Sequence, residues 1–233
     1  MIDLINADCL EAMRDIPDGS IDMVLTDPPY GTTACKWDSV IPFEPMWEQL
    51  KRITKKNGAI VLTASQPFTS ALIMSNIKMF KYCWVWDKVS PTGHLNAKKR
   101  PMRKLEDIAV FSQGAIDYIP QGLVWNPRKK NRRATTKGSD CYGKHGSNNI
   151  ATWQGYPTER LEFGNENGLH PTQKPVALME YLIKTYTNEG ETVLDFTMGS
   201  GTTGVAAKNL NRSFIGIELD ETYFNIAKDR INN

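Results

Sequence analysis

Apolar and polar positions are regularly spaced in the first third of the chain, and this spacing predicts strands and helices in turn. The apolar run at residues 21–26 is typical of a buried strand, whereas residues 45–55 place Met46, Leu50 and Ile53 on one face of a helix. The same pattern predicts a strand at 59–63, a helix near 69–77 and a strand near 82–86. Strands that alternate with helices favour an α/β fold around a mostly parallel sheet.

The regular pattern breaks between Pro91 and Leu169, where Gly, Asn, Pro and basic residues are frequent. Within this segment only residues 107–112 and 161–163 resemble strands. Long irregular segments in a compact domain are usually functional or disordered. Regular elements then return as a helix at 176–186, a strand at 192–196, a helix at 202–209, a strand at 213–217 and a helix at 221–231.

The length of the chain limits the number of domains. A chain of 233 residues is long enough for one well-buried α/β domain and too short for two large ones. We therefore expect residues 1–90 and 170–233 to form two parts of one core, with residues 91–169 as a basic, irregular insertion.

Composition argues against a membrane protein. The chain is 40% hydrophobic and 23% charged, and no window reaches the roughly 18 apolar residues of a membrane span. Asp3 stands where a secretory signal would carry a basic residue, and no apolar segment follows it. We expect a cytoplasmic protein with no membrane partner.

The cysteines and histidines suggest neither disulfides nor a metal site. Cys9, Cys35, Cys83 and Cys141 are separated by 26, 48 and 58 residues, without a paired motif. The three histidines also lack the spacing of metal ligands. We expect buried thiols and no bound metal.

Positive charge is concentrated in the middle of the chain, although the net charge is only +2. From Lys88 to Lys144 there are 13 basic and four acidic residues, a balance of +9, so the rest of the chain sums to −7. This asymmetry favours an insertion that faces a polyanion, attached to a near-neutral or acidic body.

The sequence Asp27-Pro28-Pro29-Tyr30 directly follows the predicted strand at 21–26. By itself it could be a strand that ends in a Pro-Pro turn. It also suits an exocyclic amine, a poor nucleophile whose N–H groups could donate to the Asp27 carboxylate and the Pro28 carbonyl as positive charge develops. The prolines have no N–H to compete, and Tyr30 offers a flat face to a base taken out of its helix.

A second motif runs from a strand through Gly199-Ser200-Gly201 into a helix, an arrangement that brings backbone close to a nucleotide-like ligand. Glu218 ends the following strand 17 residues beyond Gly201, where an acid can hold ribose hydroxyls. A dinucleotide-binding fold is the alternative, although the full glycine pattern of that fold is absent.

A third motif, His170-Pro171-Thr172-Gln173-Lys174-Pro175, precedes the helix at 176–186. It could be a loop that places Pro175 in the first helical turn. Its hydroxyl and ammonium groups could also hold the carboxylate of an amino-acid moiety at the helix start.

These three motifs, in this order, resemble the amino-methylating DNA methyltransferases of the permuted β group. The resemblance covers nearly the whole chain and is weakest between residues 91 and 169. It implies the seven-stranded, mostly parallel sheet of the Rossmann-like S-adenosylmethionine-dependent methyltransferase fold, with helices on both faces.

The resemblance also implies roles for individual residues. Asp27, Pro28, Pro29 and Tyr30 would be catalytic. Asp8 and Cys9 would contact the cofactor adenine, Thr172 and Lys174 its methionine end, and Glu218 its ribose. The full set expected around the cofactor is Asp8, Cys9, Asp27, His170, Thr172, Lys174, Asp195, Phe196, Thr197, Gly199, Ser200, Gly201, Thr202, Thr203 and Glu218.

One departure from the family pattern concerns the aromatic residue before the glycines. The family has Asp-Pro-Phe where this chain has Asp195-Phe196-Thr197. Phe196 could replace the usual aromatic contact through a shifted backbone path, or that contact could be missing.

Two basic clusters in the middle segment are candidates for phosphate contact. Solvated loops are the alternative. Such contacts would position DNA without specifying its sequence. The residues concerned are Lys98, Lys99, Arg100, Arg103 and Lys104 in the first cluster and Arg128, Lys129, Lys130, Arg132 and Arg133 in the second.

The sequence therefore predicts a methyltransferase that acts on N6 of a flipped adenine in double-stranded DNA. Cytosine N4 is an alternative target, because both bases present a similar amine, and RNA or protein substrates are further alternatives. A non-catalytic DNA-binding regulator with the same fold is the alternative of another class. By analogy with short members of the family, we expect a homodimer.

Overall fold

The computed structural model describes residues 1–33, 38–125, 153–166 and 173–233. The chain divides into two compact units. We call residues 1–119 and 159–233 the core unit and residues 120–158 the inserted unit. The core unit carries every motif of the previous section that lies within the described residues.

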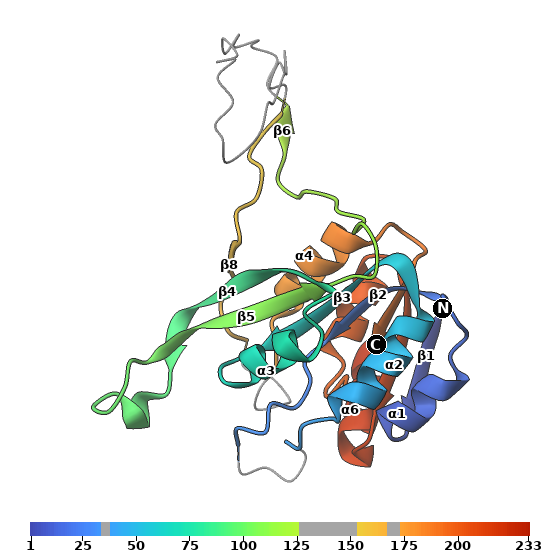
Figure 1. The fold of residues 1–233 in the computed structure, drawn as a ribbon, viewed down its shortest axis with the longest axis horizontal. Helices are drawn as coiled ribbons and strands as arrows, with labels where there is room; N and C mark the ends of the chain where they lie inside the picture. The colour runs from blue at the N-terminus through green and yellow to red at the C-terminus, as the bar shows by residue number, and fades with distance from the viewer. Residues whose placement is uncertain (34–37, 126–152, 167–172) are drawn as a thin grey trace. The chain divides into compact units, whose positions relative to one another are not determined.

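An eight-stranded sheet forms the centre of the core unit, in the order β1-β10-β9-β2-β3-β5-β4-β8 (Figure 1). Only β5 runs antiparallel to its neighbours; the other pairings are parallel. The strands are β1 (Ile2–Asn6), β2 (Ile21–Thr26), β3 (Thr54–Ala64), β4 (Phe80–Thr92), β5 (Arg103–Phe111), β8 (Arg160–Glu162), β9 (Thr192–Asp195) and β10 (Ser213–Glu218).

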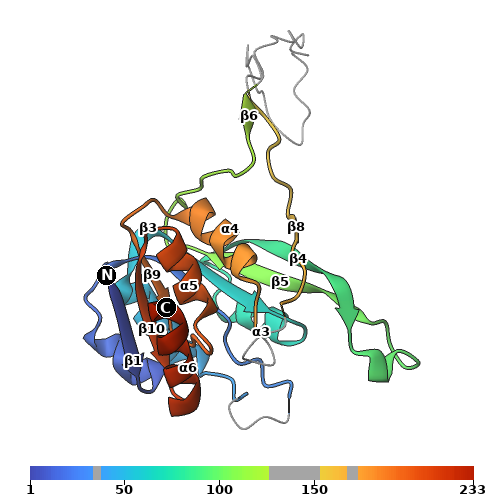
Figure 2. The same ribbon diagram turned by 180° about the vertical axis from the view of Figure 1, so that it is seen from behind.

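Helices cover both faces of this sheet. Figure 1 shows α1 (Cys9–Ala12), α2 (Phe43–Ile53) and α3 (Phe68–Ser75) over one face, and Figure 2 shows α4 (Val176–Tyr186), α5 (Thr202–Asn209) and α6 (Glu221–Asn232) with the other. Two short 3₁₀ turns, Met13–Asp15 and His94–Asn96, complete the helical elements of the described chain. The predicted α/β architecture is confirmed, with one strand more than the seven expected.

Strand β2 shows why both faces need cover. All six of its residues are buried, which is typical of a central parallel strand. Val24 packs into the hydrophobic cluster on the α1–α3 side, whereas Met23 and Leu25 pack into the cluster on the α4–α6 side. Successive side chains thus alternate between the two clusters, as strand geometry requires.

Helices α4 and α5 have the bounds that their periodicity predicts, and most strands were also located correctly. Strand β1 was missed: it pairs only with β10 at the sheet edge, and its residues are exposed or half-buried. Strand β5 is longer than expected and begins at Arg103, so part of the segment interpreted as irregular belongs to the sheet.

The ends of the strands bring distant residues to one edge of the sheet. The carboxyl ends of β1, β10, β9, β2 and β3 meet there because these strands are mutually parallel. The antiparallel register adds β5, because Ala64 at the end of β3 pairs with Asp107. Ligands of α/β sheets usually bind at this edge.

The inserted unit contains a small two-stranded sheet within its described residues. β6 (Val124–Trp125) and β7 (Trp153–Gln154) pair antiparallel, and the rings of Trp125 and Trp153 meet edge to face with centroids 5.1 Å apart. The second basic cluster, predicted at residues 128–133, lies outside the described residues. In the described parts of the chain, no helix is long and apolar enough to span a membrane.

Candidate active site

The carboxylate of Asp27, directly after β2, lies among three donors. Oδ1 accepts hydrogen bonds from the Tyr30 hydroxyl at 2.7 Å and from the Thr63 hydroxyl. Oδ2 accepts a hydrogen bond from Lys174 Nζ at 2.7 Å. Thr63 comes from the neighbouring parallel strand and Lys174 from the segment before α4, so the folded chain fixes both carboxylate oxygens.

The rest of the predicted catalytic tetrad lies against the core. Pro28 is buried and Pro29 is half-buried. The ring of Tyr30 stacks on Phe68 of α3, with centroids 5.2 Å apart and planes inclined by 26°. Burial, and then the charge of Asp27, raises the pKa of Tyr30, so its hydroxyl remains a hydrogen-bond donor.

Lys174 lies beside the catalytic carboxylate as a buried cation. Its Nζ is 2.7 Å from Asp27 Oδ2 and 3.6 Å from Glu106 Oε2 on β5. Burial works to lower the pKa of Lys174, but the charges of Asp27 and Glu106 outweigh it and hold this pKa above its usual value. The sequence assigned Lys174 to the methionine end of the cofactor; the structure places its ammonium on Asp27.

Asp195, at the end of β9, links the glycine loop to the tetrad. Its Oδ1 accepts hydrogen bonds from the Thr26 hydroxyl at 2.6 Å and from the Thr197 backbone N–H at 3.1 Å. The Thr197 hydroxyl lies 2.6 Å from that of Thr26 and donates to the backbone carbonyl of Asp27 at 3.2 Å. Burial raises the pKa of Asp195 to about 6, although these hydrogen bonds and one from Thr203 oppose the rise.

Phe196 and Thr197 stand where the family has proline and phenylalanine, and they have different surroundings. The side chain of Phe196 is 1% exposed and belongs to the hydrophobic cluster on the α1–α3 side. Its ring therefore packs in the core. Thr197, at the position of the family's aromatic residue, instead supplies the hydroxyl that contacts the tetrad backbone.

Two glycines shape the loop between β9 and α5 in different ways. Gly199 has a φ of 51°, and no atom of the described residues lies within 4 Å of the place where a Cβ would stand. Gly201 has a φ of 81°, and a Cβ there would approach Ala227 and Ile231 of α6 to 3.0 Å. Gly199 therefore borders open space, whereas Gly201 is required for packing.

Glu218, at the end of β10, lies beside this open space. Its Oε2 accepts a hydrogen bond from the Gly199 N–H at 2.9 Å, and its Oε1 accepts one from the Asp220 N–H at 2.8 Å. Burial raises the pKa of Glu218 despite these two bonds. The acid predicted for ribose binding is thus adjacent to the glycine loop.

The other predicted residues of the loop are tied to neighbouring elements. Arg230 of α6 donates to the Ser200 carbonyl at 3.2 Å and to the Thr202 hydroxyl at 3.0 Å. The Ser200 hydroxyl lies 3.3 Å from Gln173 Oε1 and donates to it. Thr202 and Thr203 are buried in the first turn of α5.

Asp8 and Cys9 follow β1 at the same edge of the sheet. The Ala7 N–H donates to the Glu218 carbonyl at 3.2 Å, which keeps this segment next to the end of β10. The Asp8 carboxylate caps α1 by accepting from the Leu10 N–H at 2.8 Å. Cys9 is buried in the core, and burial raises the pKa of its thiol to about 12.

Sequence reasoning missed several residues that contact the site. Thr63 had a signal, because it ends the strand predicted directly after that of the tetrad. Glu106, Lys88 and Arg230 had none, because their approach depends on tertiary contacts of β4, β5 and α6. His170 and Thr172 lie outside the described residues.

Comparison with solved structures identifies the class. A complex of M1.HpyAVI with S-adenosylmethionine is similar at a TM-score of 0.68 and 28% identity, covering 99% of this chain and 100% of the other. The cytosine-N4-specific PvuII DNA methyltransferase has a TM-score of 0.69 at 17% identity, covering 98% of this chain and 86% of the other. The fold is that of an S-adenosylmethionine-dependent methyltransferase.

Sequence comparison identifies the family. The family model described as DNA methylase matches residues 21–229, and the chain belongs to that family. The type II methyltransferase M.HpaI of Haemophilus parainfluenzae is 28% identical over 99% of this chain and 74% of its own length. M2.DpnII of Streptococcus pneumoniae is 28% identical over 98% of this chain and 88% of its own length. The predicted family is thereby confirmed.

The raised pKa of Asp195 predicts a dependence of stability on pH. Between pH about 4 and pH about 6 the folded state keeps a proton that the unfolded state has lost, so this group makes stability fall as pH rises through that window. Asp195→Asn removes the effect and keeps an acceptor oxygen. Its free energy of unfolding, relative to the unsubstituted protein, should rise by roughly 2–3 kcal/mol across the window.

Urea denaturation at several pH values measures this difference. Asp3→Asn, at an exposed position, is the matched control and should show no such trend. A difference between Asp195→Asn and the unsubstituted protein that stayed constant with pH would mean that Asp195 titrates normally.

Proposed function

We propose that this DNA methylase transfers the methyl group of S-adenosylmethionine to N6 of an adenine flipped out of double-stranded DNA. The observation that carries the proposal is the junction of the two motifs: the Thr197 hydroxyl, from the glycine loop, donates to the Asp27 carbonyl at 3.2 Å. The residue expected to receive the amine and the loop expected to approach the cofactor are therefore joined directly.

The open space at Gly199 suits the cofactor. A Cβ at this position would meet no atom of residues 1–33, 38–125, 153–166 or 173–233 within 4 Å, which leaves room for a ligand to approach the backbone. Glu218 accepts a hydrogen bond from the Gly199 N–H beside this space, and we assign the ribose hydroxyls to it. When bound, the cofactor supplies a methyl group on a sulfonium that departs as a neutral thioether.

Oδ2 of Asp27 is the carboxylate oxygen that can accept a hydrogen bond from the target amine. Oδ1 already accepts from Tyr30 and Thr63, whereas among the described residues Lys174 is the one donor to Oδ2. A carboxylate oxygen has two lone-pair sites, so Oδ2 keeps one for an amine N–H. The Pro28 carbonyl is the second proposed acceptor.

These acceptors stabilise the positive charge that develops on the amine nitrogen. The new bond joins that nitrogen to the methyl carbon while the carbon–sulfur bond breaks, and the nitrogen then releases one proton. Acceptors that are fixed before the reaction stabilise such charge more effectively than mobile water does. The contacts from Lys174, Tyr30 and Thr63 fix Asp27 in this way.

The choice of adenine rests on Asp at the first position of the tetrad, which resembles adenine-N6 enzymes. Cytosine N4 is the second candidate, because PvuII DNA methyltransferase, named as cytosine-N4-specific, has a similar fold. Mass spectrometry of nucleosides from the methylated DNA distinguishes the two products. Competition between DNA and RNA in the same reaction tests whether DNA is the preferred substrate.

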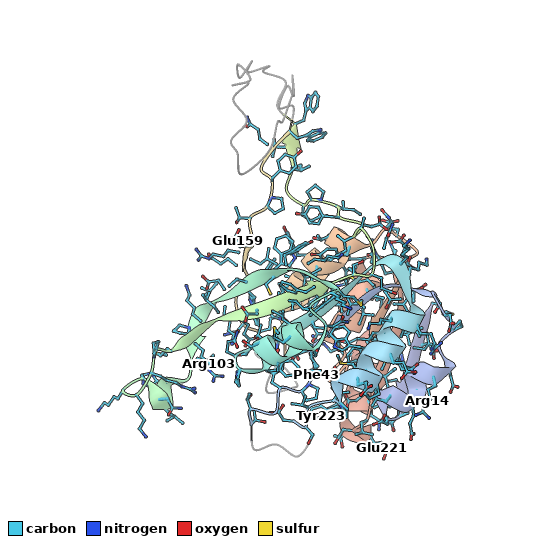
Figure 3. The ribbon with its side chains drawn as sticks, in the orientation of Figure 1. Arg14, Phe43, Arg103, Glu159, Glu221 and Tyr223 are labelled. Atoms are coloured by element: carbon cyan, nitrogen blue, oxygen red, sulfur yellow. The ribbon has the colours of Figure 1, made fainter. Side chains whose placement is uncertain are left out.

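The first basic cluster supports a contact with DNA phosphates. Strands β4 and β5 continue as a two-stranded ribbon, and its turn carries Lys98, Lys99 and Arg100 in exposed positions, with Arg103 exposed on the ribbon (Figure 3). Lys104 differs, because its Nζ lies 3.1 Å from Asp87 Oδ1. We propose that the exposed members contact phosphate. A homodimer and a cytoplasmic location remain predictions.

Substitution of the catalytic carboxylate should separate chemistry from cofactor binding. Asp27→Asn keeps the shape of the side chain and removes the charge that accepts the amine. Methyl transfer in a single turnover should fall by about a hundredfold or more, the scale of one preorganised contact, while cofactor affinity changes little. Tritiated cofactor measures transfer and equilibrium dialysis measures binding.

Asp18→Asn, at a carboxylate whose side chain is 78% exposed, is the control and should retain full activity. Near-normal turnover by a folded Asp27→Asn protein would show that the proposed chemistry is wrong.

Substitution of Gly199 should abolish cofactor binding without preventing folding. Gly199→Val places a side chain in the open space and costs on the order of 1–3 kcal/mol of backbone strain. Gly190→Val is a matched control, because Gly190 has a φ of 82°, no atom within 4 Å of its Cβ position, and a location at the opposite end of β9. Calorimetric titration should detect cofactor binding by the Gly190 variant only. Equal binding by both would contradict the proposed site.

Charge reversal on the ribbon should weaken DNA binding independently of sequence. Lys98→Glu with Lys99→Glu should lower affinity for all duplexes and reduce the slope of log affinity against log salt by about 2, because each lost phosphate contact removes roughly 0.9. Fluorescence anisotropy at several salt concentrations measures the slope. Reversal of Lys78 and Lys81, exposed near the other end of β4, should leave it unchanged. An identical slope in both double variants would exclude the ribbon as a phosphate contact.

A further inference from the structure

Four side chains of alternating charge form a row that begins at the catalytic carboxylate. Lys174 Nζ is 2.7 Å from Asp27 Oδ2 and 3.6 Å from Glu106 Oε2. Lys88 Nζ pairs with Glu106 Oε1 at the other end. The four residues come from the end of β2, the segment before α4, strand β5 and strand β4. We call Asp27, Lys174, Glu106 and Lys88 the charge row.

Most of the charge row is shielded from water. The exposed fraction of the side chain is 7% for Lys174, 15% for Glu106 and 9% for Lys88. Within the described chain, Glu106 Oε2 has no hydrogen-bond partner, so Lys174 at 3.6 Å is its nearest recorded counter-charge. Buried ion pairs often stabilise a fold less than apolar side chains of similar volume do. Stability alone is therefore a weak reason for Glu106 to be here.

The backbone of β4 is distorted where it delivers Lys88. Val89 has a φ of 66°, which is unfavourable for a β-branched residue. The Asp87 carboxylate holds this bend by accepting from the Val89 N–H at 3.0 Å, and Asp87 is itself paired with Lys104 and Arg160. Strained backbone persists only where its surroundings impose it, and it is concentrated at functional sites.

We propose that Glu106 is a positioning residue for methyl transfer, which holds the ammonium of Lys174 at Asp27 Oδ2 and is itself held by Lys88. The inference rests on the proposed function. Lys174 is the one donor to Oδ2 among the described residues, so its position decides where the remaining lone pair of Oδ2 points. A displacement of Lys174 would therefore displace the acceptor of the amine.

The charge of Glu106 has a second effect on Asp27. Because Lys174 lies between two carboxylates, its positive charge is not directed at Asp27 alone. Without Glu106, the row of four would carry a net charge of +1 beside a nitrogen that becomes positive. Loss of Glu106 should therefore lower the rate of transfer in two ways, through the displacement of Lys174 and through the net positive charge. Neither effect requires Glu106 to touch the substrate.

Glu106→Gln tests the proposal, because it removes the charge and keeps the shape. The rate of methyl transfer in a single turnover should fall about tenfold or more, while affinities for cofactor and for duplex DNA stay within about threefold. Glu162→Gln is the control and should retain the full rate. Glu162 lies on β8, which pairs with β4, and its side chain is 61% exposed. A folded Glu106→Gln protein with a normal rate would overturn the proposal.

A double-mutant cycle tests whether Glu106 acts through Lys174. If it does, Glu106→Gln should cause little further loss in a Lys174→Gln background, because the group that it positions is gone. Losses that multiply would show that Glu106 acts by another route and would overturn the proposal. Transfer is measured as total methyl incorporated into DNA. A cytosine product would therefore contradict the proposed target base, but the double-mutant cycle would still test the role of Glu106.

A further variant guards against failure to fold. Lys88→Leu with Glu106→Leu replaces a buried pair by apolar side chains, an exchange that often preserves stability. This double variant removes one charge of each sign, so only the loss caused by the displaced Lys174 ammonium should remain. Its rate should still fall severalfold below that of the unsubstituted protein, with an unchanged urea midpoint for unfolding. A normal rate in this variant would also overturn the proposal.

Discussion

The ion pair between Lys174 and Asp27 is the interaction on which the rest of the site depends. It joins residues separated by 147 positions in the sequence, at a distance of 2.7 Å. For this contact to form, the segment before α4 must return to the end of β2, and β9, the strand that follows α4, pairs with β2. The Asp27 carboxylate is then held from three directions, because Thr63 and Tyr30 occupy its other oxygen.

A second constraint joins the glycine loop to the same strand end. Asp195 is 3% exposed, and burial of its carboxyl is tolerable because Thr26, Thr197 and Thr203 all hydrogen-bond to it. Thr197 then continues to the Asp27 carbonyl. A phenylalanine at position 197 has no hydroxyl and could not make this bond. The departure from the family pattern therefore exchanges a ring for a hydroxyl that connects the two motifs.

The sequence was sufficient for elements with a strong local period and for residues at strand ends. The helix at 176–186, the buried strand at 21–26 and the position of Glu218 all follow from patterns within a few residues. Strand β1 gave a weak pattern because it lies at an edge. Glu106 and Lys88 could not be found in this way, because the antiparallel insertion of β5 between β3 and β4 is set by long-range pairing.

The net neutrality of the charge row suits the reaction proposed for it. Methyl transfer moves one positive charge from sulfur to nitrogen, and the release of a proton then leaves the methylated nitrogen neutral. A site with a large net charge would favour one end of that movement over the other. The charge row has two ammonium and two carboxylate groups in alternation, so its total charge is zero. The positions of the individual oxygens then determine how well the positive charge on the amine nitrogen is stabilised. The residues that hold Lys174 in place then affect the rate in addition to the carboxylate that it contacts.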